Sequence, residues 1–163
     1  MKRNFFYCIL LLGALMGSCK PGENGTEVEI DPRDQYTGSY TGGYTGQTTS
    51  GPFPLNIFSG PAVIEVTKAP AVKEMLITIT YNKGIQFENS EKLTAELVDN
   101  KFTIIDKTKE PVTVGPTTYE LPYKATGEFT IKNEFVMVTS AEIVRDGTTL
   151  KKVASVTGAK KVN

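Results

Sequence analysis

Apolar and polar residues alternate in short runs along most of the chain after about residue 35. In residues 75–81, for example, Met75, Ile77 and Ile79 alternate with Leu76 and Thr78. Side chains on a β-strand point to opposite faces with period two, so each run predicts a strand with one face turned toward a core. The same alternation recurs in residues 62–68, 93–98, 101–106, 118–124, 127–131 and 134–144. Only residues 88–97 also admit a helical interpretation.

A tetrapeptide repeat begins this part of the chain, with Tyr36, Tyr40 and Tyr44 four residues apart and each followed by Thr-Gly. On a strand this spacing places the three rings on one face. The interspersed glycines permit tight bending and close backbone approach, and each ring can also lie over a neighbouring glycine and shield its backbone. We therefore expect a long, coiled first strand with an aromatic inner face. A sticky low-complexity segment or a Tyr/Gly-rich binding loop is the alternative.

Turn residues separate the predicted strands. Asp99-Asn100 and Asp146-Gly147 fit two-residue hairpins, the second of them a type I′ turn. Pro122 lacks an N–H, which indicates a bulged or edge strand at residues 118–124. In the last strand the apolar phase shifts between Leu150 and Val153, and a bulge near that point is expected.

Eight or nine strands joined by short turns form an all-β, antiparallel up-and-down meander. Residues 35–163 comprise about 130 residues, enough for one domain. A sheet with so many strands in so small a domain is expected to curl and close, because closure removes its free edges. The predicted fold is therefore a small β-barrel.

The first 19 residues carry an export signal. Lys2 and Arg3 precede an apolar stretch over residues 5–16, which is too short to span a bilayer. The ending Leu-Met-Gly-Ser-Cys at residues 15–19 resembles a bacterial lipobox, and this resemblance implies removal of residues 1–18 and acylation of Cys19. An ordinary signal peptide cleaved nearby is the alternative. Residues 19–34 are then expected to be a lipidated cysteine followed by a flexible acidic tether, with the turn into the domain at its end.

Composition excludes several functions. If Cys19 is lipidated and Cys8 leaves with the signal, no thiol remains for a disulfide or a metal. Removing Lys2 and Arg3 leaves 16 basic against 18 acidic residues, and no basic stripe is present, which disfavours nucleic-acid binding. The chain has no histidine, so Ser-His-Asp catalysis and His-ligated zinc are excluded. We expect no enzymatic activity, no metal and no cofactor, and a solvated outer face for the strand carboxylates Glu65, Glu96, Glu128 and Glu142.

Residues 51–61 are unusually apolar for a predicted connection. Glycine and proline occur at both ends, and Phe53, Leu55, Ile57 and Phe58 lie between them. Connecting loops run over the surface and seldom carry so much apolar area. The favoured interpretation is a loop that plugs the barrel and completes its core. The alternative is a lid or a contact patch.

Several of these features together resemble the small lipocalin-like, calycin-type lipoproteins of Bacteroidetes. The resemblance rests on the cysteine and acidic tether, the Asp-Pro-Arg-Asp-Gln-Tyr entry at residues 31–36, the first strand, and residues 127–131 with 135–138. It implies a lipocalin-like barrel anchored by lipid to the bacterial outer membrane, facing the periplasm or the surface. It implies no particular ligand. The chain lacks the Gly-x-Trp of lipocalins proper, since it has no tryptophan.

Two functions are compatible with this sequence. In the first, the barrel binds a small apolar or amphipathic molecule through rings and hydroxyls on its inner face. In the second, the core is solid and the domain is a tethered interaction module, an accessory or inhibitor of an envelope complex. An internal cavity of about 300 Å³ or more favours the first. The candidate tyrosines are Tyr36, Tyr40, Tyr44, Tyr81, Tyr119 and Tyr123.

Overall fold

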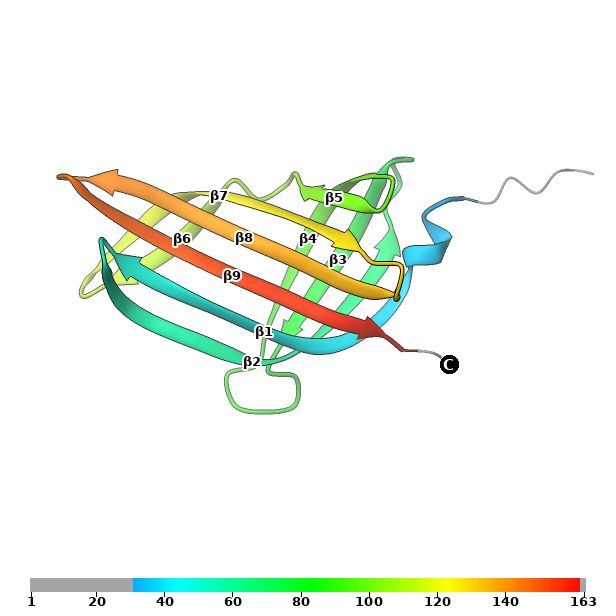
Figure 1. Cartoon of the computed structure of the whole chain (residues 1–163), viewed down its shortest axis with the longest axis horizontal. Coiled ribbons are helices and arrows are strands. Elements are labelled where there is room, and N and C mark those ends of the chain that lie inside the picture. Colours follow the sequence, from blue (N-terminus) through cyan, green and yellow to red (C-terminus); the bar gives the residue numbers. More distant parts are fainter. Residues whose placement is uncertain (1–30, 162–163) are drawn as a thin grey trace, which may run out of the picture. The chain divides into compact units, whose positions relative to one another are not determined.

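Nine strands and one 3₁₀ turn make up most of residues 31–161, which are the residues that the computed structural model describes (Figure 1). The predicted signal peptide, Cys19 and the tether up to residue 30 lie outside them. In chain order the elements are η1 (Asp34–Tyr36), β1 (Gly38–Ser50), β2 (Phe53–Lys68), β3 (Glu74–Tyr81), β4 (Asn89–Val98), β5 (Lys101–Ile104), β6 (Lys109–Val114), β7 (Thr117–Phe129), β8 (Glu134–Arg145) and β9 (Thr148–Lys160).

The strands follow one another around a single antiparallel sheet. Their order is β5-β4-β3-β2-β1-β9-β8-β7-β6, and β5 also pairs with β7. This last pairing closes eight strands into a barrel and leaves β6 as an extra strand beside β7. The all-β, up-and-down barrel predicted from the alternation is therefore confirmed. Closure is local: β5 pairs with residues 126–128 of β7, whereas β6 pairs with residues 117–122 farther along the same edge.

The predicted hairpin turns are present. Asp99 has a positive φ of 57°, and Asp146 and Gly147 have φ of 48° and 76°, as a type I′ turn requires. Pro122 lies just beyond the last β7–β8 pair, Tyr123 with Ala141, so it occupies an edge as predicted. At both hairpin turns, a local residue preference determined where the chain reverses.

Aromatic side chains fill one end of the barrel. The rings of Phe102 and Phe135 stack with centroids 5.3 Å apart, and Phe129 stacks on Tyr36 at 4.6 Å. Tyr40 is fully buried among them. Tyr36, in η1, and Tyr44, in β1, are partly buried and pack against the hydrophobic core of the barrel. The prediction of one aromatic face for the repeat is confirmed, although β1 begins only at Gly38.

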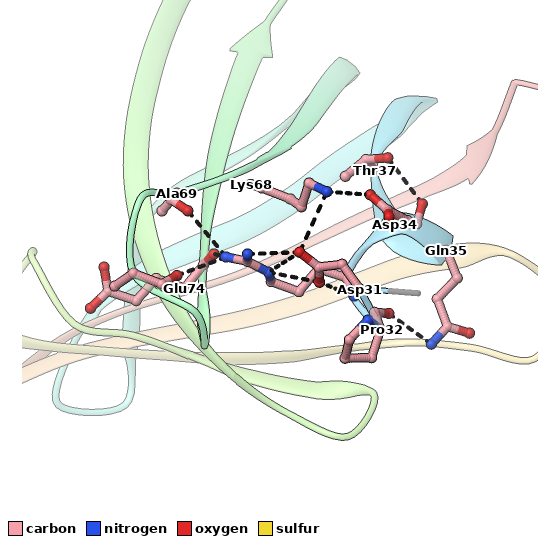
Figure 2. Close-up of polar contacts among 10 residues, drawn as sticks. Asp31, Pro32, Asp34, Gln35, Thr37, Lys68, Ala69 and Glu74 are labelled. Carbon is pink, nitrogen blue, oxygen red and sulfur yellow. Dashed lines mark hydrogen bonds and ion pairs between the residues drawn. The ribbon is translucent and has the colours of Figure 1, made fainter. Parts of the chain in front are cut away.

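Arg33 seals this closed end, and Figure 2 labels its partners Asp31, Ala69 and Glu74. The guanidinium of Arg33 donates hydrogen bonds to the carbonyls of Ala69 (3.1 Å) and Ala71 (2.7 Å) in the β2–β3 connection and of Glu74 (3.0 Å) at the start of β3. It also forms an ion pair with Asp31 at 2.8 Å. Hydrogen bonds that the side chain and the backbone N–H of Arg33 donate to the Asp31 carboxyl hold its pKa well below its usual range. Residues 31–34, which sequence analysis places at the end of the flexible tether, are thus packed onto the barrel.

Residues 51–61 are not a loop, contrary to the sequence prediction. Gly51 (φ 55°) and Pro52 form a tight turn, and β2 then runs without a break from Phe53. Pro54 and Pro61 are accommodated because β2 pairs with β3 only over residues 62–68, so neither proline interrupts that ladder. The apolar residues that resembled a plug are the first half of a strand that extends past its neighbour.

The bulge predicted in the last strand is also absent. β9 pairs in continuous register with both β1 and β8. Lys152 occupies an inner position, in phase with Leu150, Ala154 and Val156. Because a polar residue at an inner position interrupts the alternation of apolar and polar residues, the sequence falsely indicated a bulge there. The register shift is instead between Thr48 and Thr49 of β1.

Candidate functional site

The end of the barrel opposite Arg33 is open. Three hairpins, β1–β2, β6–β7 and β8–β9, extend there beyond the shorter β3 and β4, as Figure 1 shows. A connection over residues 82–88 joins β3 to β4 at this end. Between these elements lies a cavity of about 590 Å³, here called the open-end cavity. Its lining includes Tyr44, Phe58, Tyr81 and Tyr123, together with four charged side chains.

Those four side chains form a continuous chain of ion pairs, here called the ionic cluster: Glu91, Lys107, Glu110 and Lys152. Lys107 Nζ contacts Glu110 Oε2 at 2.5 Å and also contacts Glu91, and Lys152 Nζ contacts the other oxygen of Glu110. The residues come from β4, the β5–β6 connection, β6 and β9, so the cluster connects distant parts of the barrel. Their side chains are only 12–30% exposed.

Mutual pairing keeps the central pair of the cluster ionised. Burial alone would lower the pKa of Lys107, but its hydrogen bonds with Glu110 and Glu91 outweigh this, and the pKa is raised. Burial alone would raise the pKa of Glu110, and its hydrogen bonds with Lys107 and Lys152 lower it instead. Two positive and two negative groups make the cluster neutral overall.

Aromatic rings form the apolar part of the lining. Tyr44 and Tyr81 meet edge to face with centroids 4.9 Å apart, and Phe58 is 6.3 Å from Tyr44. Tyr81 Oη donates to Glu91 (3.3 Å), and Tyr44 Oη donates to Asn82 Oδ1 (3.2 Å). Burial and the neighbouring Glu91 carboxylate raise the pKa of the Tyr81 hydroxyl. The site thus presents aromatic surface beside fixed polar groups.

The lysines of the cluster also contact rings. Lys107 Nζ lies 4.4 Å from the centroid of Tyr123, and Lys152 Nζ lies 5.6 Å from that of Phe58. Burial raises the pKa of the Tyr123 hydroxyl. A cation over an aromatic face is attracted by the ring quadrupole. These contacts orient the lysines along the cavity wall.

The predicted site residues divide into three groups. Tyr44, Phe58, Tyr81 and Tyr123 line the open-end cavity. Tyr40 belongs to the closed-end core, where its hydroxyl donates to the carbonyl of Tyr36 at 2.7 Å and burial raises its pKa to about 12.

Tyr119, on β7, is not among the residues that line the cavity, and the guanidinium of Arg145 lies 5.6 Å from its ring. Phe53 and Ile57 are 70% and 73% exposed, and Leu55 is also exposed. The prediction that this apolar segment plugs the core is therefore wrong.

The ionic cluster was missed by sequence reasoning, which considered only the strand carboxylates Glu65, Glu96, Glu128 and Glu142 and assigned them to the outer face. Glu65, Glu96 and Glu142 are indeed exposed, and Glu128 is half-buried. Glu91 and Glu110 point inward, because partners from other strands neutralise them. The phase shift at Lys152 was the one local signal of an inward charge.

Acid should weaken the fold through Glu110. Because its pKa in the folded state is below the ordinary value of 4.5, its stabilisation is present above pH 4.5 and is lost as the pH falls through the lowered pKa. Urea unfolding of Glu110→Gln should show a clear loss of stability at pH 7 and a smaller one at pH 3. The exposed Glu142, paired with Lys151 at 3.0 Å, supplies the control Glu142→Gln, which should change little at either pH. Equal losses for Glu110→Gln at both pH values would contradict the assignment.

Comparisons with known proteins identify no family for this chain. No protein-family model matches it, and no curated protein is similar to it. Seven chains of solved structures match. One is the monomer form of the M. tuberculosis PknI sensor domain, with 9% sequence identity and a TM-score of 0.46, covering 76% of this chain and 86% of that chain. Similarity at this level supports no functional argument.

The described residues also contain no helix that is long and apolar enough to cross a membrane. Within residues 31–161, no three acidic, histidine or cysteine side chains gather as a metal site would require.

Proposed function

We propose that the domain is a non-enzymatic binding protein that takes up a small amphipathic ligand in the open-end cavity. The observation that carries this proposal is a cavity of about 590 Å³ whose lining combines aromatic rings with a few fixed polar groups. Small-molecule sites typically have volumes of about 300–1,000 Å³ and this kind of lining. The two carboxylates of the cluster are engaged by lysines, which disfavours a role as general base.

The lining determines what kind of molecule fits. An apolar ring or chain would contact Tyr44, Phe58 and Tyr81, and its polar end would reach Lys152 or Glu91. The hydrogen bonds within the cluster hold these charges in place before the ligand arrives. Such preorganisation lowers the entropic cost of binding.

A pair of matched substitutions on β9 tests the site. Ala154 lines the cavity, whereas its neighbour Ser155 points to the other face of the strand. We expect Ala154→Phe to fill the cavity and weaken binding of a dansyl-labelled fatty acid at least about tenfold in a fluorescence titration. Ser155→Phe adds the same ring outside and should leave the affinity unchanged. Equal affinities for both variants would rule out the cavity as the binding site.

Phe58 and Phe53 should respond differently to substitution by serine. Phe58 is half-buried against Tyr44, so Phe58→Ser should cost roughly 1–2 kcal/mol of folding free energy and weaken probe binding. Phe53 is largely exposed, and Phe53→Ser should remain within about 0.5 kcal/mol of wild type. Urea denaturation and probe titration measure both effects. A large destabilisation by Phe53→Ser would restore the plug interpretation.

We further propose that the protein is attached to the bacterial outer membrane through an acylated Cys19. The support is the sequence of residues 15–19, which resembles a lipobox. Cys19→Ala should abolish incorporation of labelled palmitate and release the protein from the membrane fraction. Cys8→Ala is the matched control and should leave labelling intact. Palmitate incorporation by the Cys19→Ala variant would contradict the proposal.

A further inference from the structure

We propose that the side of the barrel between β2 and β6 binds an extended peptide segment by strand addition. Two strand edges without a partner border a cleft on this side. This site adjoins the open-end cavity, with which it shares Phe58, Pro111 and Lys152, but it recognises peptide backbone rather than a small molecule.

The first edge is the N-terminal half of β2. This strand pairs with β1 over its whole length, but β3 covers only residues 62–68, so residues 53–60 have no second strand neighbour within the described chain. The carbonyl of Pro61 accepts a hydrogen bond from Asn82 N (2.9 Å) on the β3 side. Because successive residues of a strand point their N–H and C=O to opposite sides, Ser59 and Ile57 present theirs to the same open edge.

The second edge belongs to β6, which pairs with β7 alone among the strands of residues 31–161. The carbonyl of Thr108 accepts a hydrogen bond from Tyr123 N (2.9 Å), so the even-numbered residues of this strand face β7. Lys109, Pro111 and Thr113 therefore face away from β7. Thr113 offers both an N–H and a C=O, whereas Pro111 offers only a C=O.

A cleft of about 430 Å³, here called the side cleft, lies between these edges. Its lining joins Leu55, Asn56 and Phe58 of β2 to residues 111–115 at the end of β6, with Lys152 beside them. Backbone groups along an edge pair with an extended chain, while alternate side chains of that chain enter neighbouring pockets. The exposed Leu55 and Ile57 favour apolar side chains in such a chain. The chemistry of the cleft thus fits an extended peptide with alternating apolar residues.

The prolines define how long that peptide can be. Proteins commonly protect free edges with proline, and Pro54 and Pro61 do so at the two limits of the β2 edge. The six residues between them carry no proline, which leaves room for pairing with a short segment only. A short, bounded edge of this kind suits recognition of a peptide better than pairing with a long strand.

Proline substitution tests the proposal at one atom. The N–H of Ser59 faces the open edge, so Ser59→Pro removes a donor without removing a hydrogen bond to β1, and Ser59→Ala removes only the hydroxyl. Heptapeptides selected from a random phage library on the wild-type protein serve as probes, synthesised with blocked ends. We expect Ser59→Pro to weaken their binding about tenfold and Ser59→Ala to leave it unchanged. Methylation of alternate peptide nitrogens should weaken binding in the same way.

The second edge supplies an independent pair, Thr113→Pro and Thr113→Ala, for use if Ser59→Pro does not fold. Selected peptides that bind the proline variants as well as wild type, or a library that yields none, would overturn the proposal. Dimers in sedimentation that dissociate in Ser59→Pro would also overturn it, since the occupant would then be a second copy of the chain. Binding of the dansyl-labelled fatty acid should be unaffected by either proline, which separates this proposal from that for the open-end cavity.

Discussion

Replacing Gly42 by valine is expected to unfold the barrel or to lower its melting temperature by more than about 10 °C. A Cβ atom added at Gly42 would lie 2.0 Å from the carbonyl oxygen of Thr157 and 2.6 Å from the Cα of Gly158. Both atoms belong to the backbone of β9 and cannot rotate away. Accommodating valine requires β1 and β9 to separate, so the cost should reach about 3 kcal/mol or more.

Thermal unfolding followed by circular dichroism measures this effect. Thr41→Val is the matched control, because it places the same side chain on the exposed face of the same strand and should change little. A Gly42→Val protein that melts within about 2 °C of wild type would show that β1 and β9 do not approach this closely.

The physical reason differs from the sequence expectation. The repeat suggested that tyrosine rings cover the glycines of their own strand. Tyr44 instead covers Gly60 on β2, where an added Cβ would lie 2.9 Å from a ring carbon. Gly42 is required by the close approach of β9, and no local pattern reveals which strand lies there. The sequence therefore located the sensitive glycine but assigned it the wrong neighbour.

Strands and turns were predictable because their signals are local. The alternation in residues 75–81 and the Asp146-Gly147 turn depend on a few adjacent residues, and the structure confirms both. Residues 51–61 were mistaken for a loop because glycine and proline at each end signal a connection. They form a strand because β2 extends beyond β3, and strand length relative to a neighbour depends on pairing between distant segments.

The candidate site was predictable only in its aromatic part. Tyr44, Tyr81 and Tyr123 fall on inner positions that the alternation assigns correctly. An inward charge requires a partner of opposite sign, and the partners of Lys107 lie 16 residues before it and three residues after it in sequence. Lys152 reaches Glu110 across 42 residues. Without the fold, such residues are indistinguishable from solvated lysines and glutamates.

Arg33→Ala is expected to lower the melting temperature by more than about 10 °C, although sequence analysis places this residue in a tether. Arg33 is 8% exposed and supplies hydrogen bonds to three carbonyls in the β2–β3 connection and at the start of β3. Removing it takes this donor from the carbonyl of Ala69, leaves the carbonyls of Ala71 and Glu74 with their backbone donors alone, and leaves the Asp31 carboxylate without its guanidinium partner. A buried polar group that loses its partner bears its full desolvation cost.

Lys68→Ala is the control for this prediction. Lys68 pairs with Asp31 at 3.4 Å and with Asp34 at 2.5 Å, but its side chain is 38% exposed, and ion pairs so exposed contribute little. Its loss should shift the melting temperature by no more than about 2 °C. Arg33→Lys should fall between the two variants, because an ammonium keeps the charge and lacks the fork that reaches several carbonyls at once. Equal melting temperatures for Arg33→Ala and Lys68→Ala would mean that Arg33 does not seal the barrel and that the folded domain begins after it.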